Sequence, residues 1–260
     1  MLDSPSLRWR PAAPLVGFKR QRTLDHYRTP NATPPTPVVD PARRTVVSVY
    51  DGDGSALAPW AERGYRCVSL AGFLQLRDTD LVDVAFACAS PPSRDLSVAG
   101  ARHWKRKREK DPHFQDKAVA LVKEIRDVFE AWGCPYYISN PASSQLRKLW
   151  REPNYTYQPY DFGGWLDPTD KHPLYPDFIP AQDAYSQQQG LWTGGGFRMP
   201  AGKPVEPEWK YFTSARKGAG GTRRRRMSPV LYSNWSARGA RASTPRGFAC
   251  ALCQRLTSSI

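Results

Sequence analysis

The stretch DVAFACASPPSRD, residues 83–95, ends a short apolar run with two prolines, followed by a serine, an arginine and an aspartate. The run is bounded by residues that break regular structure, which indicates a central β-strand rather than a helix. Pro91 and Pro92 stop backbone hydrogen bonding, because neither has an N–H and each restricts its predecessor to extended backbone. Since open α/β sheets bind ligands at the carboxyl ends of their strands, this stiff loop is either a rigid turn or a binding site.

Strands and helices alternate on both sides of this loop. Strands are predicted at residues 45–50, 64–70, 82–87 and 135–138. The first strand runs into the glycine turn at residues 51–55, and a helix through Trp60 follows it. Residues 116–132 have apolar positions at helical spacing with charges on the opposite face, and Gly133 ends that helix. This alternation predicts an α/β domain with a doubly wound, mostly parallel sheet.

The two ends of the chain differ from this central part. Residues 1–42 are rich in proline and arginine without sustained periodicity, so we expect a flexible arm ahead of a domain spanning residues 43–260. Residues 151–238 are basic, aromatic and rich in glycine and proline, and we expect them to be an irregular region that contacts nucleic acid. A helix over residues 244–256, begun by Pro245, is expected to pack back on the core.

The charge of the chain favours a polyanionic partner. Lys and Arg number 38 against 24 Asp and Glu, which gives a formal charge of +14 at pH 7. The uninterrupted basic runs at residues 105–108 and 223–226 argue against a charge that serves solubility alone. The second run lies in the segment GAGGTRRRRMSP, which we interpret as a glycine-flanked loop. Nucleic acid is the first candidate partner, with affinity that falls steeply as salt is added.

The sequence argues against three classes of protein: membrane proteins, metal-binding proteins and secreted proteins held together by disulfides. No apolar stretch is long enough to cross a bilayer and no cleavable leader is recognisable, so we expect a soluble intracellular protein. Five scattered cysteines do not form a secreted disulfide framework. A zinc site at Cys250 and Cys253 would need a second ligand pair at suitable spacing, so we expect two cysteines on the C-terminal helix and no metal.

The glycine turn at residues 51–54 suits a ligand other than a pyrophosphate. Its glycines let the backbone approach a ligand closely, but the three-glycine dinucleotide fingerprint is absent from this turn. The carboxylates of Asp51 and Asp53 would repel a pyrophosphate, whereas they could accept hydrogen bonds from an ammonium group or a ribose. S-adenosylmethionine presents both groups.

Five segments between residues 45 and 256 form an ordered set: VVSVYDGDGSALAPWAERGY, ASPPSRDLSVAGARHW, YYISNPASSQLRKLW, GLWTGGGF and TPRGFACAL. This set resembles the DNA cytosine-5 methyltransferases, particularly their small phage-type members. The resemblance implies a sheet of the S-adenosylmethionine-dependent methyltransferase type, with the methyl donor at its carboxyl edge. It also implies duplex DNA as partner, a cytosine flipped out of the stack, and the cytoplasm of a bacterial or phage-infected cell.

The same resemblance assigns roles to individual residues. The catalytic positions would be Pro92, Ser93, Ser139 and Asn140. S-adenosylmethionine would be held by Tyr50, Asp51, Gly52, Gly54 and Pro91. DNA would be contacted by basic residues of two segments: Arg94, Arg102, Lys105, Arg106, Arg223, Arg224, Arg225 and Arg226.

Two catalytic positions depart from the family pattern. The family has a cysteine where this chain has Ser93, and a glutamate where it has Ser139. In the family the thiolate adds to cytosine C6 and makes C5 nucleophilic, while the glutamate supports ring N3. A serine hydroxyl has a much higher pKa than a thiol, so we expect C5 transfer to be slow or absent. Cys88 belongs to the apolar run that begins at residue 83 and is expected to point into the core. The family's basic residues before GLW are replaced by Gln187, Gln188 and Gln189.

Three functions are compatible with this pattern. The first is a DNA cytosine methyltransferase with weak C5 activity. The second is an N4-cytosine methyltransferase, because amino methyltransferases look similar at Ser90-Pro91-Pro92, although Ser93 stands where they have an aromatic residue. Attack by an amine needs positioning more than a nucleophile, so this chemistry could survive both replacements. The third is a catalytically silent methyltransferase fold that binds DNA through its basic runs.

Overall fold

The computed structural model describes residues 44–78, 81–215, 222–232 and 238–258, so the arm expected at residues 1–42 lies outside the described residues. The strands are β1 (Thr45–Val49), β2 (Arg66–Leu70), β3 (Val84–Ala89), β4 (Tyr136–Pro141), β5 (Tyr155–Tyr157), β6 (Gln189–Gly194), β7 (Lys210–Ala215) and β8 (Thr222–Met227). The α-helices are α1 (Ala58–Ala61), α2 (Phe73–Arg77), α3 (Trp104–Lys110), α4 (Phe114–Trp132), α5 (Leu146–Leu149), α6 (Pro229–Tyr232), α7 (Arg238–Ala242) and α8 (Arg246–Ser258). Short 3-10 helices are η2 (Val98–His103), η3 (Pro159–Trp165) and η4 (Ala181–Asp183).

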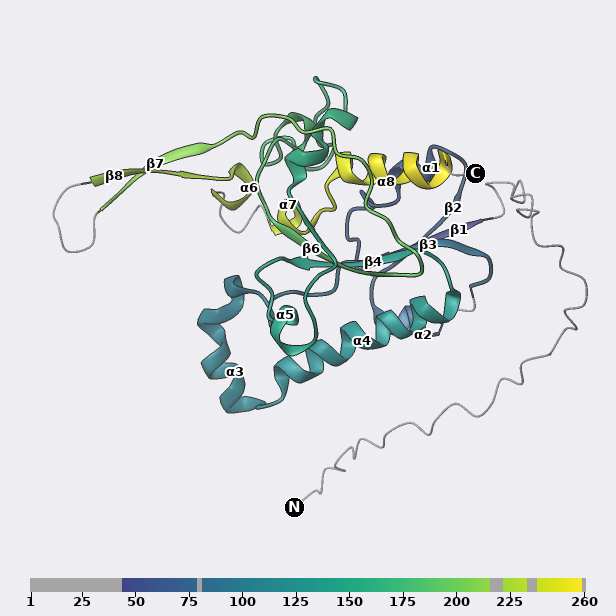
Figure 1. Ribbon diagram of the computed structural model, residues 1–260. Coiled ribbons are helices and arrows are strands. Elements are labelled where there is room, and N and C mark those ends of the chain that lie inside the picture. Colours follow the sequence, from purple (N-terminus) through teal and green to yellow (C-terminus); the bar gives the residue numbers. More distant parts are fainter. Residues whose placement is uncertain (1–43, 79–80, 216–221, 233–237, 259–260) are drawn as a thin grey trace, which may run out of the picture. The chain divides into compact units, whose positions relative to one another are not determined.

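Six strands form a central sheet in the order β2-β1-β3-β4-β6-β5 (Figure 1). Strands β1 to β4 are parallel to one another, whereas β6 runs antiparallel to both of its neighbours, β4 and β5. The fold is therefore α/β with a mostly parallel sheet, as the sequence predicted. The chain leaves β1 for β2 and then returns to β3 on the other side of β1. In open α/β sheets, ligands bind at the carboxyl ends of the strands beside such a reversal.

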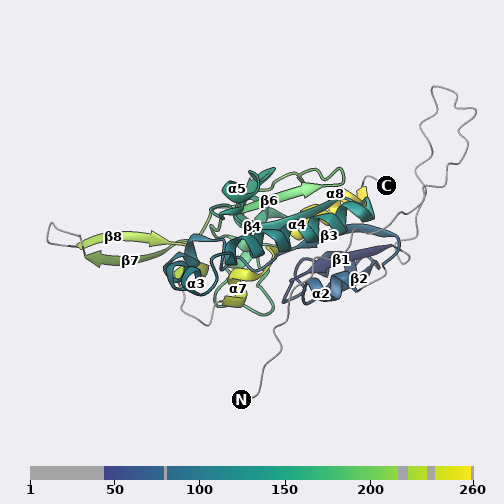
Figure 2. The ribbon, with the colours of Figure 1, turned by 90° about the horizontal axis from the view of Figure 1, so that it is seen from below.

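Helices cover both faces of the sheet, as a doubly wound fold requires (Figure 1, Figure 2). On one face, Ile125 and Phe129 of α4 are fully buried in a cluster with side chains of β1, β3 and β4. On the other face, Trp60 of α1 stacks on Phe86 of β3 with ring centroids 5.4 Å apart, and Phe248 of α8 joins the same cluster. Because the strands between these layers are buried on both faces, they are nearly continuous apolar runs in the sequence.

Two strands begin two residues later than the sequence predicted. The strand predicted at residues 82–87 is β3 and begins two residues later, because Asp83 has a φ of 51° that interrupts extended backbone. The strand predicted at residues 64–70 is β2 and begins at Arg66, because Gly64 has a φ of 79° in the turn that follows α1. In both places a residue in the left-handed region interrupts extended backbone, and the strand starts only after it.

The arginine run at residues 223–226 lies in β8, so its interpretation as a loop is wrong. β8 pairs with β7 in a separate two-stranded antiparallel ribbon that extends away from the central sheet (Figure 1). Repulsion between like charges disfavours such a strand, but pairing with β7 and stacking of arginines on aromatic side chains offset it. The Arg224 guanidinium, for example, lies 4.4 Å from the centroid of the Tyr211 ring.

Gly133 ends α4 in the left-handed conformation, with a φ of 65°. Gly133→Ala is expected to lower the free energy of unfolding by about 1 kcal/mol, because a side chain is strained at positive φ. An added Cβ would meet no atom within 4 Å, so the cost is conformational and involves no clash. Denaturant unfolding measures it, with Gly52→Ala as a matched control that meets equally open space without a positive φ. Equal losses in the two variants would contradict this explanation.

Candidate functional site

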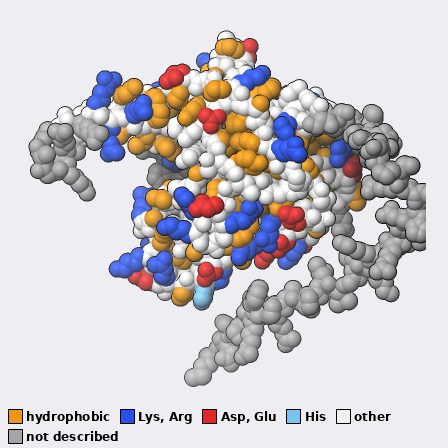
Figure 3. Space-filling model, viewed as in Figure 1, with side chains coloured by type: hydrophobic (Ala, Val, Ile, Leu, Met, Phe, Trp, Pro, Cys, Tyr) orange, Lys and Arg blue, Asp and Glu red, His pale blue; other side chains and the backbone are white. Residues whose placement is uncertain are grey.

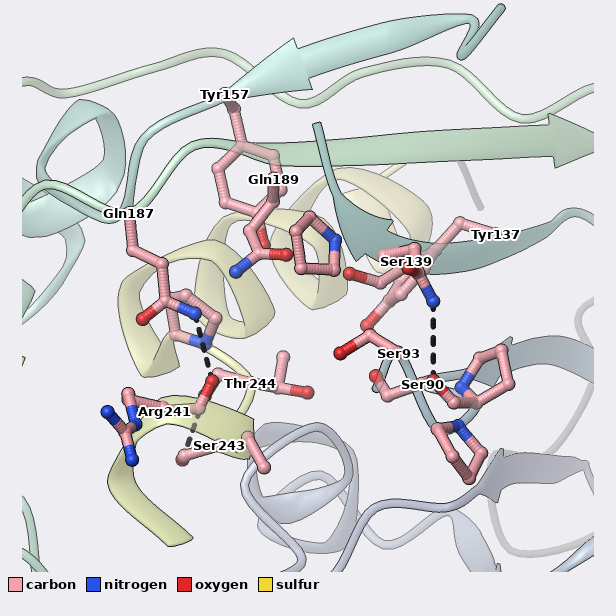
Figure 4. Close-up of a pocket in the computed structure, with 16 residues that line it drawn as sticks. Ser90, Ser93, Tyr137, Ser139, Tyr157, Gln187, Gln189, Arg241, Ser243 and Thr244 are labelled. Atoms are coloured by element: carbon pink, nitrogen blue, oxygen red, sulfur yellow. Dashed lines mark hydrogen bonds between the residues drawn. The ribbon is translucent and has the colours of Figure 1, made fainter. Parts of the chain in front are cut away.

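A pocket opens at the carboxyl ends of β3, β4 and β5, beside the reversal of strand order (Figure 4). Its cavity volume is about 140 Å³. A cavity of roughly 150 Å³ holds a benzene ring, so this pocket has the size for a single six-membered ring. Its lining residues are Ser90, Pro91, Pro92, Ser93, Tyr137, Ser139, Asn140, Pro141, Tyr157, Gln187, Gln189, Arg241, Ala242, Ser243, Thr244 and Pro245.

The four residues predicted as catalytic meet in this pocket. Pro92 and Ser93 follow β3, whereas Ser139 and Asn140 lie in β4, and the parallel pairing of these strands brings the residues together. Asn140 is buried, and its Nδ2 donates a hydrogen bond to the Pro91 carbonyl oxygen at 3.3 Å. Its Oδ1 is buried without a hydrogen-bond partner in the described part of the chain. The pocket therefore contains a fixed amide with a spare acceptor.

Gln187 supplies a second spare acceptor. Its Nε2 donates to the Arg241 carbonyl oxygen at 2.9 Å, while its Oε1 is buried and has no partner among the described residues. Gln187 and Arg241 lie across the space from Ser93 and Ser139 (Figure 4). A buried acceptor without a partner costs about 1–3 kcal/mol, so a ligand that donates N–H groups would be stabilised here.

The pocket is nearly uncharged and has no thiol among the described lining residues. Arg241 is the one charged side chain of that lining, and no carboxylate or imidazole is present there to act as a base for Ser93. Cys88 is 2% exposed and belongs to the core cluster beneath α1 and α8, as predicted. Burial raises the pKa of its thiol to about 12, so Cys88 cannot replace the expected nucleophile.

Asp51 lies at the end of β1, beside the pocket. A hydrogen bond of 2.9 Å from Ser90 N to the Val49 carbonyl oxygen joins the proline loop to the end of this strand. Asp51 Oδ2 accepts the Ala56 N–H at 3.2 Å, whereas the buried Oδ1 has no partner in the described ranges. Burial, reinforced by the nearby Asp53 carboxylate, raises the pKa of Asp51 to about 6. At neutral pH its carboxylate is mostly ionised, with Oδ1 unpartnered among the described residues.

The other residues predicted to hold S-adenosylmethionine lie in three places. An added Cβ at Gly52 or Gly54 would meet no atom within 4 Å, so the backbone of the turn is open to a ligand. Tyr50 instead contacts the start of α2, where its hydroxyl oxygen accepts the Phe73 N–H at 3.1 Å. Pro91 lines the pocket together with the predicted catalytic residues. The turn residues Asp51, Gly52 and Gly54 thus form the core of the candidate donor site.

A buried polar cluster that the sequence analysis missed joins the glycine turn to the pocket. His172 Nε2 lies 3.1 Å from Ser243 Oγ and 3.8 Å from Asp53 Oδ2. His172 Nδ1 accepts the N–H groups of Leu174 and Tyr175, each at 3.2 Å, which assigns the proton to Nε2. Burial lowers the pKa of His172, so the ring is a neutral donor that positions Ser243 rather than a base. An isolated histidine 71 residues away from Ser243 gives no signal of this contact in the sequence.

The residues predicted to bind DNA lie in two exposed segments. The first comprises the loop after β3, with η2 and α3, and its predicted residues are all exposed: Arg94, Arg102, Lys105 and Arg106. The second is β8, where the exposed side chains are Arg224, Arg225 and Arg226. For Arg223 only the strand assignment is described. The structure thus places both basic runs on solvent-facing elements.

Metal ligands and membrane spans were also sought in the described ranges. No group of three or more potential metal ligands occurs there, and Cys250 and Cys253 both lie on α8 as predicted. Within the same ranges, no helix combines the length and apolar character needed to cross a bilayer. No protein-family model matches this chain, and no curated protein matches it at a significant level. The geometry of the pocket and the glycine turn is therefore the basis for assigning a function.

Proposed function

We propose that this protein transfers a methyl group from S-adenosylmethionine to an exocyclic amine of a base in duplex DNA, with cytosine N4 as the first candidate. The observation that carries the proposal is the nearly uncharged pocket at the carboxyl edge, with Asn140 Oδ1 and Gln187 Oε1 buried and unpartnered among the described residues. An exocyclic amine donates N–H groups to such acceptors. The volume of about 140 Å³ favours the single ring of cytosine over a purine.

The glycine turn is the proposed site of the methyl donor. Asp51 Oδ1, which has no partner among the described residues, would accept a hydrogen bond from the ammonium group or a ribose hydroxyl of S-adenosylmethionine. The open backbone at Gly52 and Gly54 would allow the donor to approach closely. Bound there, S-adenosylmethionine would supply an electrophilic methyl group. The hydrogen bond between Ser90 and Val49 holds this turn next to the pocket, which supports transfer between the two sites.

The pocket residues would act by positioning the amine. Asn140 Oδ1 and the second lone pair of the Pro91 carbonyl oxygen would accept its N–H groups and direct the nitrogen lone pair toward the glycine turn. Burial raises the pKa of the phenols of Tyr137 and Tyr157, so both stay neutral and form walls of the pocket. As the new N–C bond formed, the methyl C–S bond of the sulfonium would break and S-adenosylhomocysteine would leave with that electron pair. The nitrogen would become cationic and release one N–H proton to water. This route requires neither a thiolate nor a dedicated base.

Methyl transfer to C5 is less compatible with the site. That route requires a nucleophile that adds to C6, and the described lining residues contain neither a thiol nor a base for Ser93. The glutamate expected at position 139 is a serine, which lacks the carboxylate that would support N3. The serines at positions 93 and 139 also favour a second candidate, a DNA-binding protein without catalytic activity. Such a protein would not need to bind S-adenosylmethionine.

Titration calorimetry of the full chain with S-adenosylmethionine tests the donor site. We expect one donor molecule to bind per chain, because Asp51 has a buried acceptor without a partner among the described residues. ATP is the control ligand, and we expect no binding, because the carboxylates of Asp51 and Asp53 would repel its phosphates. Absence of S-adenosylmethionine binding would contradict the proposal and favour the silent DNA-binding protein.

A further inference from the structure

We infer that the β7–β8 ribbon inserts into the major groove of duplex DNA and contacts it through Arg224 and Arg226. This inference deepens the proposed function and rests on it for the choice of DNA as the polymer. It adds the element that binds the duplex, the groove that receives it and the side chains that make the contacts.

One face of the ribbon presents arginines stacked on aromatic rings. Strand pairing places Tyr211 opposite Arg226 and Thr213 opposite Arg224, so these side chains share a face. The Arg224 guanidinium lies 4.4 Å from the Tyr211 ring centroid, and the Arg226 guanidinium lies 4.3 Å from the Trp209 ring centroid. Arg225, which pairs with Phe212, points to the opposite face.

Each of the two guanidinium groups lies over an aromatic ring, and neither has a hydrogen bond or an ion pair with another described residue. A cation–π contact at an exposed site contributes about 0.5–1 kcal/mol and involves the flat face of the guanidinium. Its N–H groups point outward in the plane, in the fork that binds O6 and N7 of guanine or a phosphate. Both arginines are exposed, and Tyr211 is 54% exposed. The ribbon therefore presents ordered donors, so a partner would lose less side-chain entropy when it binds.

The ribbon carries positive charge without compensation in its own sequence. Residues 210–227 contain seven Lys and Arg and no Asp or Glu. A two-stranded ribbon is marginally stable in water, and four successive arginines repel one another. Duplex DNA has a negative charge for about every 1.7 Å of its axis, which complements this density of arginines.

Shape favours DNA over RNA as the partner. The major groove of B-DNA is about 12 Å wide and accepts a two-stranded β-ribbon, whereas the major groove of A-form RNA is too narrow. The ribbon and the basic helix α3 lie toward the same end of the sheet, with the plane of the sheet between them (Figure 1, Figure 2). Lys and Arg side chains gather over both elements on the face seen in Figure 3. A duplex held by both would lie on the side where the carboxyl edge and the pocket open.

A binding assay without methyl donor tests the contribution of these arginines. Arg224→Gln/Arg226→Gln is expected to weaken duplex binding about tenfold near physiological salt and to reduce the slope of log affinity against log salt by about 2. Arg66→Gln/Arg77→Gln removes the same charge from exposed positions on β2 and α2 and is the matched control. Equal losses in the two double variants would contradict the inference. Retained S-adenosylmethionine binding in the ribbon variant would show that its fold is intact.

A modified duplex tests the groove directly. Methylation of guanine N7 blocks the major groove edge, so the wild-type protein is expected to bind the modified duplex more weakly than the unmodified one. Arg224→Lys/Arg226→Lys keeps the charge but removes the planar fork, so it should bind both duplexes alike. Equal binding of the two duplexes by the wild-type protein, or equal binding of RNA and DNA duplexes, would overturn the inference. Loss of S-adenosylmethionine binding alone would contradict only the proposed methyl transfer.

Discussion

Asn140→Ala is expected to lower the rate of methyl transfer about 100-fold, the size of effect seen when one preorganised hydrogen-bonding group is removed from an active site. Its Oδ1 is buried and unpartnered among the described residues, and the hydrogen bond from Nδ2 to Pro91 fixes its orientation. Without this oxygen, the target amine loses the acceptor that orients it. The turnover rate with labelled S-adenosylmethionine measures the effect, and the affinity for the donor should change less than about twofold, because Asn140 lies outside the glycine turn.

Ser139→Ala is the matched control for this prediction. Ser139 lines the same pocket and precedes Asn140 in β4, but in the proposed amine chemistry it has no assigned contact. Its turnover rate is expected to stay within about threefold of wild type. A full rate in Asn140→Ala would contradict the role of the amide, and an equally large loss in Ser139→Ala would assign the effect to packing of the pocket.

Asp51→Asn is expected to weaken S-adenosylmethionine binding about 30-fold, because hydrogen bonds to charged groups contribute about 1.5–3 kcal/mol. The amide oxygen of asparagine can still accept the Ala56 N–H that Asp51 Oδ2 accepts at 3.2 Å, so the turn should keep its shape. Calorimetric titration of both proteins gives the change in affinity. An unchanged affinity would show that the donor does not contact this carboxylate.

The same substitution should change how stability depends on pH. Burial and the neighbouring Asp53 raise the pKa of Asp51 from 3.8 to about 6, so between these values the folded chain binds a proton more tightly than the unfolded chain. The free energy of unfolding therefore falls as pH rises from about 4 to 6 and stays lower above that range. Asp51→Asn removes this loss, so the free energy of unfolding is expected to rise by about 3 kcal/mol at pH 7 and by almost nothing at pH 3.5.

Denaturant unfolding at the two pH values measures this difference. Asp78→Asn is the control, because it makes the same replacement at an exposed position outside the glycine turn. An equal rise in the free energy of unfolding at both pH values would mean that Asp51→Asn acts through packing and not through the charge of the buried carboxylate.

Much of the sheet follows from local sequence. The buried strands β1 and β3 are apolar runs ended by glycine or proline, and α4 has the helical period of an amphipathic helix. The part of the pocket at Ser93 and Asn140 could be predicted for the same reason, because parallel strands bring their carboxyl ends to one edge. Prediction from pattern alone succeeds where a short stretch of sequence determines both the element and its direction.

The rest of the site depends on contacts between distant segments that have no period. His172 reaches Ser243 from a segment without regular structure, and Tyr157 and Gln187 enter the pocket only because β6 returns antiparallel between β4 and β5. The ribbon was missed because an arginine strand is stable only with its specific partner, whose Tyr211 stacks under Arg224. Such pairings depend on cross-strand register, which the composition of either strand alone does not specify.

Nucleoside mass spectrometry of duplex DNA incubated with the purified protein and S-adenosylmethionine tests the central claim most directly. The nearly uncharged pocket, without a thiol among its described lining residues, predicts a base methylated on its exocyclic amine, with N4-methylcytosine as the first candidate. Detection of 5-methylcytosine alone would contradict the proposed chemistry. Unmodified DNA from a sample in which donor binding has been measured would contradict methyl transfer itself.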